Sequence, residues 1–218
     1  MNADNHAALI QRAQTATYDP RDRIASLTKT DPTSGATVDS ESYVHDANDN
    51  VISQTLKGAT TTFNYDRNRL QTAVTGGTTA SYNYDPWGRL DTITSGGQVV
   101  QRYTYDGFDR IAQQTKLNPG GTGTTTSRYT HDPLDRTSSQ TDNAGTTSEQ
   151  TTTFNYLGLS GEVIDEQIAG QLQRSYQYSP WGERLSQTKR NSDGTTEDSF
   201  YGYDPHTSVE TLTNPDLR

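Results

Sequence analysis

The apolar positions of this chain occur as pairs of aromatic residues two positions apart, and a short polar segment follows each pair. The clearest case runs from Tyr82 to Leu90 and reads YNYDPWGRL. In an extended strand, Tyr82 and Tyr84 lie on the same face. The next four residues, DPWG, are typical of a type I turn, in which the Asp85 carboxylate accepts backbone N–H groups and Gly88 takes a positive φ. The pattern therefore predicts a strand, a tight turn and a returning strand.

The same pattern recurs along the chain and constitutes an internal repeat. All thirteen tyrosines lie in its copies, and both tryptophans, Trp87 and Trp181, take the same position within it. The spacing between copies varies, so the motif is kept while the connection changes in length. The nine copies, numbered here as motifs 1 to 9, begin at Tyr18, Tyr43, Phe63, Tyr82, Tyr103, Tyr129, Phe154, Tyr176 and Tyr201.

We expect the aromatic residues to form the packed face of a sheet and the turn residues to shape its hairpins. Asp and Asn tolerate the left-handed region better than other non-Gly residues, so they can replace glycine in the turn. Gly88 is matched by Gly182, and the residues in its place in five other motifs are Asp22, Asp49, Asn68, Asp109 and Asp135. Replacing Tyr84 or Trp87 by Ala is expected to cost roughly 3–5 kcal/mol, as for other buried aromatics. The repeat aromatics singled out are Tyr82, Tyr84, Trp87, Tyr103, Tyr105, Tyr176, Tyr178 and Trp181. The repeat turns singled out are Asp85, Gly88, Asp106, Asp132, Gly182 and Asp204.

A second turn signal lies between successive motifs. Gly pairs and Asp-Gly are typical of two-residue hairpin connections. The signal is found, in chain order, at Ser34-Gly35, Lys57-Gly58, Gly76-Gly77, Gly96-Gly97, Gly120-Gly121, Ala144-Gly145, Gly170 and Asp193-Gly194. Thr-rich segments then lead into the next aromatic pair, and Thr packs well on a pleated surface. The expected fold class is all-β, with about 18 short strands in tandem antiparallel hairpins. Because sheets twist with a fixed hand, the hairpins should form a curved or spiral strip.

The strip is expected to cover residues 15–218 in about nine copies. Residues 1–14 are read as an N-terminal lead-in, within which Asn5 to Gln14 is the one helix candidate. Each hairpin needs its neighbours to cover its aromatic face, because an isolated hairpin is marginally stable in water. Stability should therefore depend mainly on contacts between adjacent copies. The unpaired edges of such a strip also suggest that it is cut from a longer shell.

The composition indicates that a large hydrophobic core is not what keeps this chain folded. Hydrophobic residues make up 28% of the chain, its mean hydropathy is −0.94 and its net charge is −9. These values alone are typical of disorder, so the repeat must supply order through stacked aromatics and Thr. The acidic balance argues against a nucleic-acid groove. No apolar run approaches the ~20 residues of a membrane span. The absence of cysteine excludes disulfides and thiolate metal sites.

Candidate chemistry is sparse. Asp46, Asp49 and Asn50 resemble the start of a calcium loop, but the Gly and the distant Glu of an EF-hand are missing. His45 and His131 replace the second aromatic of their motifs and are interpreted as packed or hydrogen-bonded rings. Because the motif aspartates recur in most copies, a turn role fits them better than catalysis. We expect no catalytic, cofactor-binding or metal-binding residue, and no cofactor. The motif arginines expected to pair with turn aspartates are Arg23, Arg69, Arg89, Arg110, Arg136 and Arg184.

The order Tyr-x-Tyr-Asp-x-x-Gly-Arg-Leu resembles the YD repeat of the rearrangement-hotspot (Rhs) proteins, the Tc-toxin shell subunits and the teneurins. The resemblance covers nearly the whole chain, and nine tandem copies make it specific. It implies a long β strip that spirals into a hollow shell. In bacterial members of the family, the shell encloses a toxic C-terminal domain. The closing region and the aspartate-dependent self-cleavage of those members have no counterpart after Asp204, so no catalytic residue is carried over.

The resemblance implies a structural protein whose partners are further repeats and a cargo segment of the same polypeptide. It also implies that the full-length protein is secreted, displayed on the cell surface or exported by a secretion system. An alternative is a surface adhesion module that binds glycans or cell-wall polymer through its aromatic ladder. Choline- and glucan-binding repeats also use Tyr, Trp and Gly but lack the Asp-turn-Arg-Leu order seen here. An enzyme is a third reading, which no constellation of residues supports.

Overall fold

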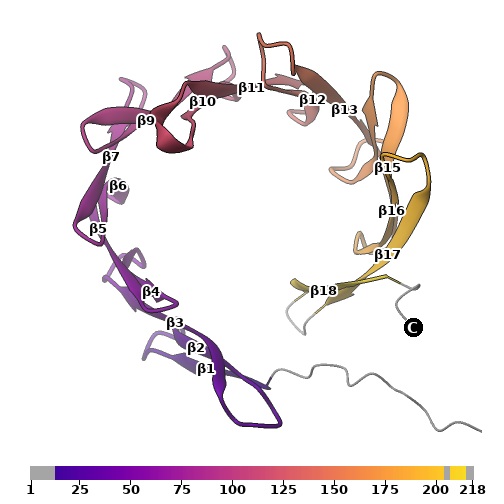
Figure 1. Ribbon diagram of the computed structural model, residues 1–218. Coiled ribbons are helices and arrows are strands. Elements are labelled where there is room, and N and C mark those ends of the chain that lie inside the picture. Colours follow the sequence, from indigo (N-terminus) through magenta and orange to yellow (C-terminus); the bar gives the residue numbers. More distant parts are fainter. Residues whose placement is uncertain (1–12, 204–206, 215–218) are drawn as a thin grey trace, which may run out of the picture. The chain divides into compact units, whose positions relative to one another are not determined.

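The computed structural model describes residues 13–203 and 207–214. These residues form 18 β-strands and one short 3-10 helix, η1 (Pro119–Gly121). The contacts divide the chain into two units, Met1–Arg102 and Tyr103–Arg218, and strand β9 (Gln98–Tyr105) crosses from the first to the second. Each strand pairs with its neighbours in sequence, and every register that is resolved is antiparallel (Figure 1). The predicted all-β fold of about 18 strands in tandem hairpins is confirmed.

The first unit holds motifs 1 to 4. Its strands are β1 (Ala13–Tyr18), β2 (Ile24–Thr30), β3 (Thr37–His45), β4 (Val51–Leu56), β5 (Ala59–Asp66), β6 (Arg69–Thr75), β7 (Thr78–Tyr84), β8 (Leu90–Ser95) and the first part of β9. In each motif of this unit, the ring residue before the turn (Tyr18, His45, Tyr65 or Tyr84) lies at or next to the end of one strand, and the motif turn leads into the next.

The second unit holds motifs 5 to 9 and repeats the same plan. Its strands after β9 are β10 (Ile111–Leu117), β11 (Thr124–His131), β12 (Thr137–Asp142), β13 (Gln150–Tyr156), β14 (Val163–Ile168), β15 (Gln171–Tyr178), β16 (Arg184–Arg190), β17 (Thr196–Tyr203) and β18 (Val209–Thr213). Asp204, one of the predicted turn residues, lies outside the described residues.

The sheet is a single layer in each unit. Along β7, Tyr82 and Tyr84 are half-buried on one face, whereas Asn83 between them is exposed. Among the described residues no side chain is less than 2% exposed, and Tyr176, at 9%, is the buried hydrophobic side chain. The other face is lined with polar side chains, including threonine hydroxyls that pair across strands, as Thr55 does with Thr60 at 2.8 Å. Order therefore comes from partial burial between neighbouring strands, without an enclosed core.

The turns between motifs follow the expected Gly pattern only in part. Gly76 and Gly77 have φ values of 56° and 79°, and Gly96 and Gly97 have 56° and 78°. Positive φ at both central residues defines the type I′ hairpin, whose twist matches that of the strands. Lys57-Gly58 (49° and 81°) and Ala169-Gly170 (49° and 73°) also have positive φ at both central positions. The connections at Gly35, Gly120, Gly145 and Gly194 are longer, so the prediction of two-residue turns is wrong for these four.

Strand β1 begins inside the predicted N-terminal lead-in of residues 1–14. Ala13 and Gln14, the last residues of the expected lead-in and of its helix candidate, belong to strand β1, in which Gln14 pairs with Lys29. Pairing with β2 overrides the weak helical pattern there. Residues 5–12 of the candidate lie outside the described residues. The coiling expected from sheet twist concerns the strip as a whole and stays a prediction.

Candidate functional site

The motif turn is built around one carboxylate. In motif 4, Asp85 Oδ1 accepts hydrogen bonds from the backbone N–H groups of Trp87 (3.0 Å) and Arg89 (2.9 Å). Its Oδ2 accepts a 2.7 Å bond from Arg89 Nε. The Gly88 N–H donates to Asp85 O at 2.9 Å, and Gly88 has a φ of 85°. Register then shifts between Asn83 and Tyr84, as in a type I turn followed by a bulge.

The same carboxylate-centred turn recurs at Asp19, Asp106 and Asp132. The hydrogen bond from Arg23 leads the causes that lower the pKa of Asp19 to about 2. At Asp106 and Asp132, burial alone would raise the pKa, but the bonds from backbone N–H groups and from the motif arginine outweigh it and lower the pKa. These aspartates are therefore ionised turn anchors.

Residues that replace Gly88 adopt the same left-handed conformation. Asp22, Asp49, Asn68, Asp109 and Asp135 have φ values between 58° and 68°. The prediction that Asp and Asn stand in for glycine is confirmed. The turn of motif 3 is one residue shorter, so that Asp66 and Arg69 are opposite each other as the last strand pair of the hairpin.

The motif arginines reach beyond their own turn. Besides its bond to Asp19, Arg23 donates from Nη1 to Asp46 O (2.7 Å) and to Asp49 Oδ1 (2.6 Å) in motif 2. Arg110 reaches Asp135 Oδ1 of motif 6 at 2.9 Å in the same way. Each of these guanidinium groups thus ties its own aspartate to the turn of the following motif.

Arg136 makes the same forward contact in motif 6, although motif 7 has no turn aspartate. It holds Asp132 through Nε at 2.7 Å. Its Nη1 donates to the backbone oxygens of Gly158 (3.0 Å) and Ser160 (2.7 Å) in the motif 7 turn. The forward contact therefore depends on the position of the arginine and on accepting oxygens, not on a particular acceptor side chain.

The second tyrosine of a motif makes the reverse contact. We call the residue that directly follows the arginine position of a motif its exit residue, as Leu70 follows Arg69. The tyrosine hydroxyl donates to the backbone oxygen of the exit residue of the preceding motif. Contacts of this kind within the described residues include Tyr65 to Val51 (3.0 Å), Tyr84 to Leu70 (2.7 Å), Tyr156 to Thr137 (2.8 Å), Tyr178 to Val163 (2.8 Å) and Tyr203 to Arg184 (2.7 Å). Together with the arginines, they join neighbouring motifs within each unit.

Two arginines depart from the predicted pairing with aspartate. Arg69 lies with its Cζ 5.3 Å from the centroid of the Tyr84 ring in the next motif. Arg184 lies 4.0 Å from the Tyr176 ring and donates to the Tyr178 hydroxyl at 3.0 Å. The shortened turn of motif 3 moves Arg69, and Glu183 takes the arginine position of motif 8. The prediction of aspartate pairing is confirmed for Arg23, Arg89, Arg110 and Arg136.

The tryptophans are not part of the packed face. Trp87 is 77% exposed and Trp181 is 85% exposed, and Phe108 at the same motif position is 78% exposed. Each is the third residue of its turn, beyond the last strand pair, where no neighbouring strand covers it. The expectation of a buried Trp87 is therefore wrong, although its ring does contact the Arg89 guanidinium at 5.0 Å. The tyrosines Tyr82, Tyr84, Tyr103, Tyr105, Tyr176 and Tyr178 are half-buried or buried.

A polar cluster surrounds the buried Tyr176. Its hydroxyl donates to Glu166 Oε1, and Arg174 Nη1 lies 3.7 Å from Glu166 Oε2. Burial, followed by the bond to Glu166, raises the pKa of Tyr176 to about 12. A phenol held neutral in this way is a structural group and a poor nucleophile. The partnership of Tyr176 with Glu166 has no signal in the motif itself, because Glu166 lies on the variable part of the repeat.

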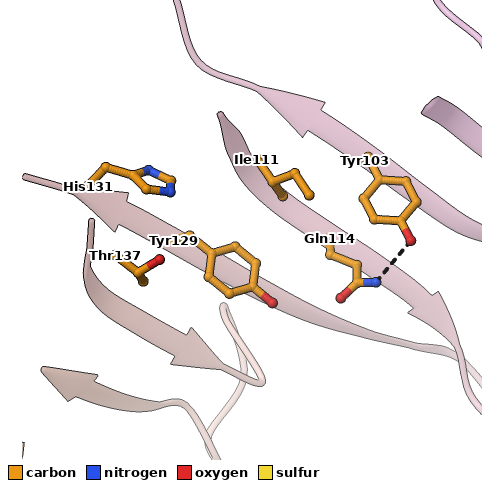
Figure 2. A pocket seen from close by; sticks show the side chains of 6 residues that line it. All are labelled: Tyr103, Ile111, Gln114, Tyr129, His131 and Thr137. Carbon is orange, nitrogen blue, oxygen red and sulfur yellow. Dashed lines mark hydrogen bonds between the residues drawn. The ribbon is translucent and has the colours of Figure 1, made fainter. Parts of the chain in front are cut away.

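The two histidine motifs interrupt the tyrosine contacts. His131 takes the second aromatic position of motif 6, and its Nδ1 lies 4.0 Å from Asp106 Oδ2. An open hollow of about 480 Å³ lies beside it, lined by Tyr103, Ile111, Gln114, Tyr129, His131 and Thr137 (Figure 2). The interpretation of His131 as a packed ring fits its side-chain exposure of 11%. The hollow itself could not be read from the sequence.

The described part of the chain shows no group of three or more His, Cys, Asp or Glu side chains arranged to hold a metal ion. Within the same residues, no helix has the length and apolar character of a membrane-spanning segment. What the arrangement can do is mechanical: ionised turns, guanidinium groups and phenols join motif to motif in both directions.

No protein-family model and no curated protein sequence matches the chain. Solved structures do match. A crystal structure of TcdB2-TccC3 with Cdc42 matches with a TM-score of 0.53 and 16% identity over 93% of this chain. A crystal structure of TcdB2-TccC3 without its hypervariable C-terminal region matches with a TM-score of 0.52 and 15% identity over 93%. The chain spans 13% of the length of each of those chains. Its fold therefore resembles that of a segment of these TcdB2-TccC3 chains.

Proposed function

We propose that this chain is a structural segment of a YD-repeat shell, and that it walls off a cargo segment of the same polypeptide. The observation that carries the proposal is the two-way connection of motifs by Tyr hydroxyls and Arg guanidinium groups. The mechanism is steric, because a continuous wall of hairpins excludes proteases and other macromolecules from what lies behind it. The full-length protein is then secreted, exported or displayed at the cell surface.

The single-layer architecture supports a wall rather than a globular catalyst. Both faces of the sheet are open in each unit, and the most buried residues include polar Thr92, Gln187 and Ser199. Such a sheet gains its strength along the strip, from one motif to the next. The likeness of its fold to TcdB2-TccC3 is compatible with the same role, because this chain matches a segment that is 13% of each of those much longer chains.

The test is protease protection in the full-length polypeptide that contains this chain. Cleavage of segments outside the repeats is followed with time in the parent and in a variant that combines Arg136→Ala with Tyr156→Phe. We expect slow cleavage in the parent and a clear acceleration in the variant, because both contacts between motifs 6 and 7 are weakened. Thr104→Ala, at an exposed position, is the control and should protect like the parent. If the parent's segments are cleaved as fast as in urea, nothing is walled off.

One observation favours a second candidate, an adhesive surface. Exposed aromatic rings such as Trp87, Phe108 and Trp181 stand at the tips of motif turns, where a glycan or cell-wall polymer could stack on them. Titration with such polymers should then quench tryptophan fluorescence, and replacing both tryptophans by Phe should remove the signal while binding persists. An unchanged spectrum in the parent would leave the shell as the proposed function.

A further inference from the structure

In motif 6 a histidine interrupts the tyrosine contacts between motifs. In five motifs a phenol ring reaches back over the preceding motif and donates to the exit residue's backbone oxygen at 2.7–3.0 Å. In motif 6 the corresponding exit residue is Ile111 of motif 5, and the side chain that should reach it is His131. An imidazole is shorter than a phenol and has no hydroxyl, and this one faces Asp106 at 4.0 Å.

The exposure of exit residues shows what the missing phenol leaves behind. Val51, Leu70 and Val163, each followed by a motif with a second tyrosine, are half-buried. Ile111, followed by His131, is 39% exposed. The other histidine motif behaves alike, because Ile24, which precedes the motif of His45, is 45% exposed. An apolar side chain is thus left uncovered wherever histidine replaces the tyrosine.

The hollow in Figure 2 occupies this place. Its volume of about 480 Å³ exceeds the roughly 150 Å³ that an apolar cavity needs to take benzene. Ile111 and the rings of Tyr103 and Tyr129 supply apolar surface, while Gln114 donates to the Tyr103 hydroxyl at 3.3 Å. The register between β10 and β11 ends at Gln113 and Arg128, so Ile111 lies beyond its last pair.

We propose that this hollow is a binding site for one para-hydroxyphenyl ring, the side chain of a tyrosine on a polypeptide segment that lies against this face. The ring covers Ile111 and contacts Tyr103 and Tyr129, and its hydroxyl donates to the Ile111 backbone oxygen, as the chain's own tyrosines do at five exit residues. The proposal rests on the proposed function only for the source of that tyrosine, the walled-off cargo segment. The hollow can be tested by itself.

The probes are p-cresol, which is the tyrosine side chain alone, and toluene, which lacks the hydroxyl. Backbone amide shifts of the whole chain are followed by NMR as each is added. We expect saturable shifts at Ile111, Gln114 and His131, with p-cresol bound about fivefold more tightly than toluene because of its hydrogen bond. Equal affinities would show an apolar hollow without tyrosine recognition and would overturn the proposal, as would shifts that never saturate.

His131→Tyr should fill the hollow from within and abolish the saturable shifts. Should that variant fail to fold, Thr137→Leu narrows the same hollow and should weaken binding of p-cresol. His45→Tyr is the matched control, since it makes the same change in motif 2 and should leave binding at Ile111 as in the parent. Persistence of the shifts in both His131→Tyr and Thr137→Leu would place the probe elsewhere and overturn the proposal.

N-acetyl-tyrosinamide and N-acetyl-phenylalaninamide distinguish a side chain in a peptide from a free phenol. We expect the tyrosine derivative to bind at the same amides as p-cresol and the phenylalanine derivative to bind about fivefold more weakly. Binding of p-cresol without binding of the tyrosine derivative would exclude a polypeptide occupant. Failure of the protease-protection experiment alone would remove the cargo as the source of the tyrosine and leave the hollow's preference intact.

Discussion

Tyr84 and Trp87 belong to one motif, and the structure predicts that they contribute very differently to stability. Tyr84 is half-buried, donates to Leu70 O at 2.7 Å and lies 5.3 Å from the Arg69 guanidinium. Trp87 is 77% exposed, and its ring lies 5.0 Å from the Arg89 guanidinium of its own turn. The first side chain joins two motifs, whereas the second covers its own turn.

The magnitudes follow from these contacts. Tyr84→Phe removes one hydrogen bond and should lower the free energy of unfolding by about 1 kcal/mol. Tyr84→Ala also removes the ring and should cost about 3 kcal/mol, the lower end for large aromatics because the residue is only half-buried. Trp87→Ala loses an exposed cation–π contact, so its cost should stay below about 1 kcal/mol. This replaces the larger cost that the sequence alone predicted for Trp87.

The assay is urea unfolding followed by far-UV circular dichroism, with midpoint and slope compared between variants. Motif 8 offers a matched pair, because Tyr178 donates to Val163 O at 2.8 Å and Trp181 is 85% exposed. Tyr178→Phe and Trp181→Ala should reproduce the difference. Equal midpoint shifts for the tyrosine and tryptophan variants in both motifs would refute the reasoning, as would a Tyr84→Phe curve that overlays the parent.

Three further predictions concern the charged and ionisable groups. Arg136→Lys should lower the free energy of unfolding by about 2 kcal/mol, because lysine cannot bind Asp132 and the next turn at once. Urea unfolding measures this difference. The control is Arg190→Lys at an exposed position, which should unfold like the parent. The pKa of Asp19 is lowered to about 2, so its ionised carboxylate contributes stability above the ordinary pKa of about 4. This stability is lost as the pH falls from about 4 toward 2. The urea midpoint should therefore fall over this pH range, and it should fall less in Asp19→Asn. The pKa of Tyr176 is raised to about 12, so its neutral phenol contributes stability that is present below about pH 10 and lost as the pH rises through 12. Alkaline unfolding can be followed by tyrosinate absorbance. The fraction unfolded should rise less steeply with pH in Tyr176→Phe than in the parent.

The sequence predicted those features that depend on a few consecutive residues. The turn of motif 4 could be derived because Asp85 accepts nearby N–H groups and Gly88 takes a positive φ, which are local properties of the residue types. The same local reasoning explained why Asp109 can replace a glycine. The order of the hairpins followed as well, because each tight turn places consecutive strands side by side.

The tertiary structure decided everything that joins one motif to another. Tyr84 and Leu70 belong to different motifs, 14 residues apart, and no pattern within a motif shows that a phenol will meet that backbone oxygen. Nor does the pattern separate Tyr84 from Trp87, because burial depends on which side chain lies beside a neighbouring strand and which lies beyond the last strand pair. The hollow at His131 has the same origin: it exists because the ring that would fill it must come from a different motif than the residues that line it. Such contacts depend on the spacing of strands in the folded sheet, which no stretch of consecutive residues encodes by itself.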